Sequence, residues 1–78
     1  MPNHNPDNYK RLESLSPLEA VRVWLAGDFA IDEDEALLSA VRSDLSVRLP
    51  DERIFEIICD SMELEETPEV CLEKLKKS

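Results

Sequence analysis

Five carboxylates lie within the stretch GDFAIDEDEALL, which spans residues 27–38. They are Asp28, Asp32, Glu33, Asp34 and Glu35. Such a cluster could coordinate a metal ion, imitate a nucleic-acid backbone or cap the start of a helix. A calcium loop needs oxygen ligands at its positions 1, 3 and 5, a glycine at 6 and a glutamate at 12, and neither Asp28 nor Asp32 begins such a spacing. We therefore predict no metal site here.

Helix capping explains most of this cluster. Asp32 is placed as an N-cap with Glu35 three residues later, which is the pattern of a capping box. Carboxylates in the first turn interact favourably with the helix dipole, by about 0.3–1 kcal/mol each. Apolar residues follow at helical spacing: Leu37, Leu38, Val41 and Leu45. We predict a helix that starts at Asp32 and includes Leu45.

A second acidic row is not explained by capping. Its four members, which fall within about 80° of one another on a helix, are Glu52, Glu56, Asp60 and Glu63. Like charges four residues apart destabilise a helix by about 0.2–0.5 kcal/mol per pair. Further acids continue the row: Glu65, Glu66 and Glu69. Two interpretations stay open, a solvated face that keeps the protein soluble and a docking surface for a basic protein partner.

The sequence contains few of the residues that catalysis would need. The chain has one histidine, His4, and one glycine, so it has neither a glycine-rich phosphate loop nor a nucleophile with a histidine base on a rigid element. We predict that the protein is not an enzyme and needs no cofactor. A free Pro2 amine with His4 could bind Cu(II) or Ni(II), but any exposed terminus with this spacing binds such ions adventitiously.

Composition and charge restrict the classes of molecule that the protein can bind. The 78 residues are 42% hydrophobic and carry a formal net charge of -9, with 18 acids against 9 bases. This charge repels phosphates, so direct binding to nucleic acid or to an anionic membrane is disfavoured and basic partners are favoured. The N-terminal residues have no apolar core of the kind that a signal peptide needs, and we expect a cytoplasmic protein.

The remaining elements follow from capping residues. Ser16 and Pro17 predict the start of a helix that ends at Gly27 and buries Trp24 in the core. Pro50 and Asp51 predict the start of the next helix, which runs through Ile54, Phe55, Ile58 and Met62. Its apolar arc, which includes Ile57 and Cys59, is broad, so we predict that it is the most buried helix. Thr67 and Pro68 predict the start of the last helix, which presents Cys71, Leu72 and Leu75. Both cysteines are expected as thiols in or beside the core.

These elements predict an all-α fold, a compact four-helix bundle with short connections. Tyr9, Leu12 and Leu15 could add a short helix, which would make it four-plus-one. Residues 1–8 are expected to form a flexible tail and residues 9–78 a single helical domain. The order VRVWL, LL, DL, RIFEII over residues 21–58 resembles the hydrophobic outline of a sterile alpha motif domain, although the glycines before its last helix are missing and no site residue is carried over.

Three hypotheses for function follow. The first is a regulatory or adaptor module that docks a basic protein surface on the acidic row. The second is a DNA mimic, whose carboxylates occupy the nucleic-acid groove of another protein. The third is a structural subunit that assembles with itself, for which Val23, off the main apolar arc of its helix, is the only indication. Monomer and homodimer both stay open.

Overall fold

The fold is described by a computed structural model that covers residues 6–77. In this part of the chain the backbone is all-α, with no strand. Its elements are α1 (Pro6–Glu13), α2 (Pro17–Ala26), the 3-10 turn η1 (Ile31–Glu33), α3 (Asp34–Arg42), α4 (Asp51–Glu63) and α5 (Pro68–Lys77). The predicted all-α bundle is confirmed in its four-plus-one form, because the short helix before Ser16 is present as α1.

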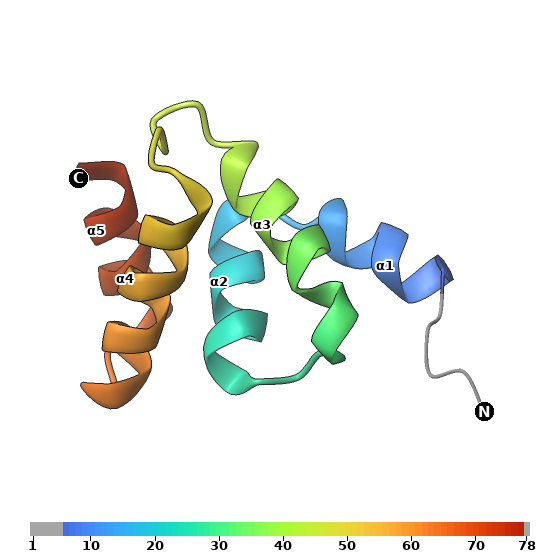
Figure 1. The fold of residues 1–78 in the computed structure, drawn as a ribbon, viewed down its shortest axis with the longest axis horizontal. Coiled ribbons are helices and arrows are strands. Elements are labelled where there is room, and N and C mark those ends of the chain that lie inside the picture. The colour runs from blue at the N-terminus through green and yellow to red at the C-terminus, as the bar shows by residue number, and fades with distance from the viewer. Residues whose placement is uncertain (1–5, 78) are drawn as a thin grey trace.

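Helix α2 lies at the centre of the bundle. It packs against α3 on one side and against α4 and α5 on the other, while α1 packs against α3 (Figure 1). The molecule is therefore elongated, with α1 at one end and the α4–α5 pair at the other. Helix α1 begins at Pro6, so residues 6–8 form its first turn. The rest of the expected tail, with Pro2 and His4, lies outside the described residues.

The predicted caps of α2 are confirmed. The Ser16 side chain accepts a hydrogen bond from the Glu19 backbone N–H, and Pro17 occupies the first turn. Gly27 has a φ of 70°, and its N–H bonds to the Trp24 carbonyl at 3.0 Å. The start of α5 is confirmed too, since the Thr67 hydroxyl accepts a hydrogen bond from the Val70 N–H. Capping patterns that stand alone in the sequence are thus found where they were predicted.

The start of α3 differs from the prediction at Asp32. The capping carboxylate belongs to Glu33, whose Oε1 accepts a hydrogen bond from the Ala30 N–H at 2.9 Å. Its other oxygen, Oε2, accepts a hydrogen bond of 2.7 Å from the Asn8 side chain of α1. Glu33 is only 3% exposed. Its hydrogen bond with Asn8 of α1 explains why this residue, among the four consecutive acids, provides the cap. The chain forms the 3-10 turn first, and the α-helix begins at Asp34.

The end of α3 was also predicted wrongly. The helix stops at Arg42, and Leu45 lies in the following loop with 84% of its surface exposed. Side-chain hydrogen bonds compete with the helix here, because the Ser43 hydroxyl bonds to the Ala40 carbonyl and the Asp44 carboxylate accepts from the Ser46 N–H. The buried side chain of the loop is Val47 instead.

The core confirms the role of Trp24, which is 4% exposed. Other predictions about burial need correction. Helix α3 has a larger share of buried residues than α4, and Cys59 on α4 is exposed while Cys71 on α5 is buried. Val23 is half-buried against the core, which removes the indication of self-assembly that its position gave. Among the helices of residues 6–77, none combines the length and the apolar character needed to cross a lipid bilayer.

Candidate interaction surface on α4

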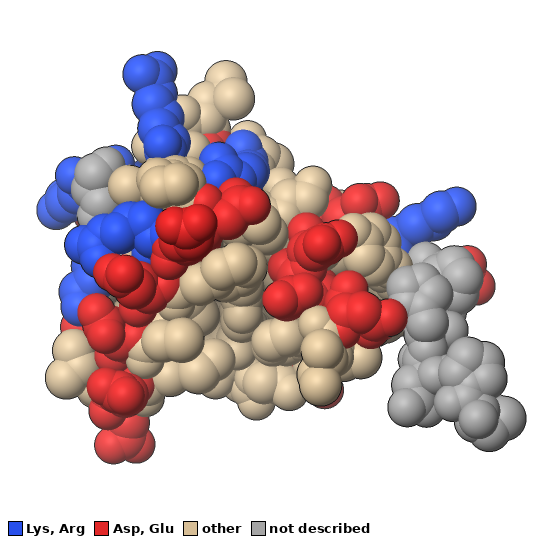
Figure 2. Space-filling view, viewed as in Figure 1, with Lys and Arg blue, Asp and Glu red and all other residues tan. Residues whose placement is uncertain are grey.

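The acidic row of the sequence forms one exposed face of α4. We call it the acidic strip and define it as Glu52, Glu56, Asp60 and Glu63. All four residues are exposed, as the helical spacing predicted. Figure 2 shows acidic side chains gathered over α4, with most of the visible basic side chains at the upper end of this helix and of α5.

The strip is poorly compensated by cations. Glu56 makes an ion pair of 2.5 Å with Arg53 on the same helix. Within residues 6–77, no ion pair or side-chain hydrogen bond is formed by the other three members of the strip. Their negative charges therefore repel one another, and the Arg53–Glu56 pair offsets only part of this repulsion. This distinguishes the strip from the carboxylate of Glu33, which has an internal structural role.

The three acids beyond the strip are placed differently from one another. Glu65 is exposed in the α4–α5 connection, and Glu69 is exposed in the first turn of α5. Glu66 is half-buried, and its Oε1 accepts hydrogen bonds from Lys74 Nζ at 2.5 Å and from the Ser61 hydroxyl at 3.0 Å. The bond from Lys74 lowers the pKa of Glu66. Its carboxylate thus joins the ends of α4 and α5, and the negative surface is interrupted there.

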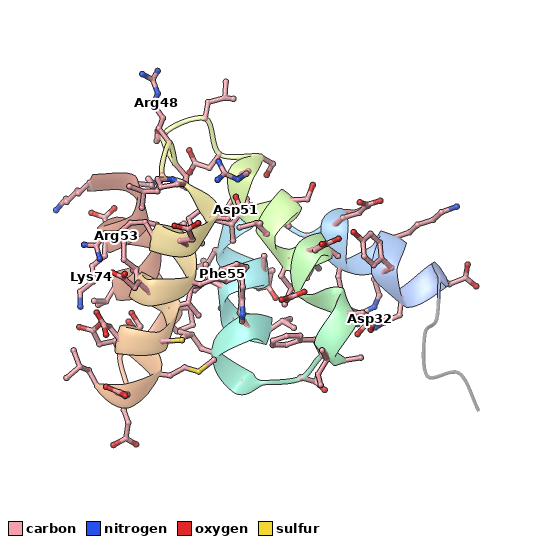
Figure 3. The ribbon with its side chains drawn as sticks, in the orientation of Figure 1. Asp32, Arg48, Asp51, Arg53, Phe55 and Lys74 are labelled. Carbon is pink, nitrogen blue, oxygen red and sulfur yellow. The ribbon has the colours of Figure 1, made fainter. Side chains whose placement is uncertain are left out.

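A shallow groove borders the strip on the side of α5. Its cavity volume is about 580 Å³, and its lining residues are Arg53, Ile57, Asp60, Val70, Glu73, Lys74 and Lys77. Arg53 and Lys74 lie on this side of the molecule in Figure 3. Each of the three cations already has a carboxylate neighbour, since Lys74 pairs with Glu66 and Lys77 with Glu73, in addition to the Arg53–Glu56 pair. The groove is therefore of mixed charge rather than an open anion site.

An apolar stripe borders the strip on its other side. Phe55, Cys59 and Met62 follow one another at positions i, i+4 and i+7 of α4, so they share one face. Phe55 is half-buried, Cys59 is exposed and Met62 is 40% exposed. Sequence reasoning assigned this stripe to the core. The helical spacing gave no sign that α2 and α5 leave this side of α4 partly uncovered.

An aromatic cluster packs against this stripe on the side that faces the core. The ring of Phe55 packs edge to face on Trp24, with centroids 5.5 Å apart. Trp24 also meets Phe29 edge to face at 6.3 Å, and Phe29 is half-buried in the segment before η1. Figure 3 shows Phe55 in the middle of this face, between α4 and α2.

A second acidic group lies where α1 meets α3. Burial raises the pKa of Tyr9, and the negative charges of Glu35, Glu13 and Asp34 raise it further. These carboxylates therefore gather around one side chain of α1. In Figure 2 the acidic residues over α4 and those near α1 and α3 are separated by a band of uncharged surface.

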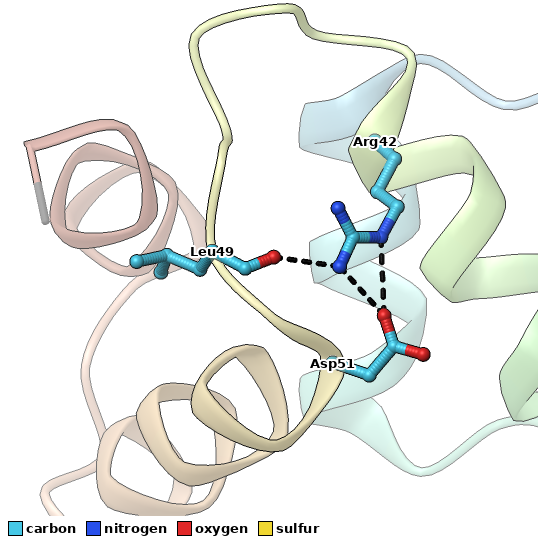
Figure 4. Close-up of polar contacts among 3 residues, drawn as sticks. All are labelled: Arg42, Leu49 and Asp51. Carbon is cyan, nitrogen blue, oxygen red and sulfur yellow. Dashed lines mark hydrogen bonds and ion pairs between the residues drawn. The ribbon is translucent and has the colours of Figure 1, made fainter.

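The position of α4 is held by an arginine on α3. Arg42 donates hydrogen bonds to the Asp51 carboxylate, at 2.6 Å from Nη2 and 3.2 Å from Nε, and Nη2 also bonds to the Leu49 carbonyl at 2.6 Å (Figure 4). These contacts join the end of α3 to the first residue of α4. They fix where the acidic strip begins relative to α3.

Among residues 6–77, no group of three or more His, Cys, Asp or Glu side chains is arranged to hold a metal ion. Comparison with known proteins adds no candidate function. No protein-family model matches this chain, and neither a curated protein nor a solved structure matches it. The function must therefore be inferred from the surface itself.

Proposed function

We propose that the protein is a small acidic interaction module, regulatory or adaptor in role, which docks a basic surface of a protein partner on the acidic strip. One observation carries this proposal. Three of the four strip carboxylates are exposed and form no ion pair or side-chain hydrogen bond within residues 6–77, on a helix that their mutual repulsion destabilises. Lysine and arginine side chains of a partner would relieve this repulsion.

We expect electrostatic attraction to set the rate at which the partner associates. Exposed charges act over about 8–10 Å at moderate salt, so they steer a basic partner before contact and raise the association rate. The net charge of -9 adds to this steering. Affinity should fall as salt rises.

A second candidate is DNA mimicry, and one feature of α4 favours it. At 1.5 Å per residue, Glu52 and Glu63 are about 16 Å apart along the helix axis, so four carboxylates give a charge roughly every 4–6 Å. This is of the same order as the 3.4 Å per phosphate of one DNA strand. A mimic would exclude nucleic acid from its partner, whereas an adaptor would bind beside it.

The test uses a double variant, Glu56→Gln with Asp60→Gln, and a control with the same change of charge, Glu19→Gln with Asp28→Asn. Glu19 lies on α2 and has an arginine neighbour, Arg22 at 3.6 Å, as Glu56 has Arg53. Each protein is immobilised and used to capture partners from its native cell extract at low and high salt. We expect a low-salt partner that the control retains and the strip variant loses. Equal capture by both variants would contradict the proposal.

Competition separates the two candidates. The captured partner is titrated with its own nucleic acid in the presence of the protein. Mutual exclusion that disappears with the strip variant supports mimicry, whereas simultaneous binding of both ligands supports an adaptor. Both variants should remain folded, and the strip variant should be at least as stable as the parent because two like-charge contacts are removed.

A further inference from the structure

We infer that the acidic strip is one rim of a wider docking surface, and that its occupant is a basic amphipathic α-helix of the partner. The inference rests on the proposed function and adds what the partner must look like. We call the surface the aromatic trough and define its floor as Phe29, Phe55, Cys59 and Met62.

The side chains of the floor are apolar, and two of them pack on the core. Phe55 and Phe29 each contact the buried ring of Trp24, so both have a fixed partner in the core while part of each remains accessible. Met62 leaves 40% of its surface exposed one helical turn beyond Cys59. Methionine is a flexible, polarizable side chain that adapts to apolar partners. The trough therefore offers apolar contact area on elements that packing holds in place.

Acidic residues lie on both sides of this floor. The strip on α4 forms one rim, and the carboxylates around Tyr9, namely Glu13, Asp34 and Glu35, form the other. Figure 2 shows acidic side chains over α4 and near α1 and α3 on one face of the molecule, with uncharged surface between them. The complementary ligand has an apolar stripe with lysine or arginine on both sides of it, which is the pattern of a basic amphipathic helix.

The trough favours a helix over an extended segment. A peptide that binds as an added β-strand pairs its backbone with a sheet edge, and residues 6–77 form no strand. A helix satisfies its own backbone hydrogen bonds and contributes only side chains to the contact.

The test uses synthetic peptides of leucine and lysine, about 18 residues long so that a helix can form. One has leucine at positions i, i+3, i+4 and i+7, the second has the same composition with leucine and lysine alternating, and the third has serine in place of leucine. None contains tryptophan, so emission of Trp24 reports binding. We expect the helical pattern to bind about tenfold more tightly than the alternating one, because only the helical pattern places all leucines on one side of a helix.

Variants locate the binding site. Met62→Ser should weaken binding of the first peptide several-fold through lost apolar contact, and Leu45→Ser, an exposed leucine in the α3–α4 loop, should not change it. Met62→Lys should weaken it further and more strongly at low salt, through repulsion of the lysines. Circular dichroism of each variant checks the fold, and the two Met62 substitutions allow the test to proceed if one of them unfolds.

The outcomes separate this inference from the proposed function. If the serine–lysine peptide binds as tightly as the first peptide and the strip variant loses both, the strip docks basic ligands but the trough is not used, and the inference is wrong. If the alternating peptide binds as tightly as the helical one, the occupant is not a helix. If the first peptide binds and depends on Met62 but not on Glu56 and Asp60, the trough binds apolar helices and the proposed role of the strip fails.

Discussion

The ring of Phe55 stands at 75° to the ring of Trp24, with centroids 5.5 Å apart. Trp24 is 4% exposed and is the only tryptophan of the chain, whereas Phe55 is half-buried at the surface of α4. Edge-to-face aromatic pairs depend on the orientation of both rings. A ligand that moves Phe55 therefore changes the surroundings of Trp24, and the protein carries its own fluorescent reporter of the face beside the acidic strip.

Trp24 also supports the whole bundle, so its removal should be costly. We expect Trp24→Ala to lower the free energy of unfolding by about 3–5 kcal/mol, since a buried aromatic side chain is replaced by a cavity. This is a large part of the stability of a small domain, which is about 5–15 kcal/mol. Trp24→Phe, which keeps an aromatic ring against Phe55, should cost less. Urea unfolding followed by circular dichroism measures both, and a small loss for the alanine variant would contradict the core role of Trp24.

Glu33 should matter more for stability than its acidic neighbours. Glu33→Ala removes the acceptor of the Ala30 N–H and of the Asn8 amide, and we expect a loss of about 1–3 kcal/mol because buried donors are left unpaired. The same substitution at the exposed Glu35 provides the control and should cost much less. Thermal unfolding compares the two. Equal losses would show that the helix dipole, and not the buried carboxylate, explains the acidic cluster.

The sequence predicts the elements of this fold well where a capping pattern stands alone. Ser16 with Pro17 and Thr67 with Pro68 have no competing residue nearby, and both helices begin as predicted. In residues 32–35 four acids compete for one cap. The choice of Glu33 depends on Asn8, which is 25 residues away, and no local pattern contains that contact.

The candidate surface, too, could be predicted from the sequence only where it depends on local spacing. Helical spacing correctly places the strip on an exposed face, because the spacing within one helix is local information. It cannot tell which edge of the apolar arc is covered, since that depends on where neighbouring helices pack. Phe55, Cys59 and Met62 therefore look like core residues in the sequence but border solvent in the structure. The mixed-charge groove between α4 and α5 escapes prediction for the same reason.

Glu65 occupies a position that suits glycine. Its φ is 54°, and the turn bonds from Glu66 N–H to the Ser61 carbonyl and from Glu65 N–H to the Met62 carbonyl form a Schellman motif at the end of α4. A left-handed conformation costs a residue with a Cβ about 1–2 kcal/mol. Glu65→Gly should therefore stabilise the protein by about 0.5–1 kcal/mol, after allowing for the greater freedom of glycine in the unfolded chain. Glu65→Gln removes the charge but keeps the strain, so a similar gain in both variants would contradict this explanation.

The Glu66–Lys74 contact should make stability depend on pH in the acid range. The hydrogen bond from Lys74 lowers the pKa of Glu66 in the folded protein below that of an unfolded glutamate. The contribution of this contact is thus present above the unfolded pKa and is lost as the pH falls through the folded pKa. Glu66→Gln should lower the melting temperature at neutral pH, and its difference from the parent should shrink in acid. A constant difference at all pH values would contradict the assignment.

The two cysteines should differ sharply in reactivity. Cys59 is exposed on the floor of the aromatic trough, whereas Cys71 is buried and its burial raises the pKa of its thiol. Because the thiolate is the reactive form, Ellman's reagent should modify Cys59 readily in the folded protein and reach Cys71 only in denaturant. Cys59→Ser should abolish the fast reaction, and Cys71→Ser should leave it unchanged; rapid modification of both thiols in the folded parent would contradict the packing of α5.

The same reaction reports on the trough directly. A helical leucine–lysine peptide that covers Phe55 and Met62 also covers Cys59, which lies between them on α4. We therefore expect saturating peptide to slow the modification of Cys59, and the serine–lysine peptide, at the same occupancy of the strip, to slow it less, because its polar side chains do not exclude the reagent from the floor. The rate is measured by stopped-flow absorbance with the Cys71→Ser variant, so that only one thiol contributes. Equal protection by both peptides would mean that charge at the strip alone, and not an apolar contact across the trough, governs access to Cys59.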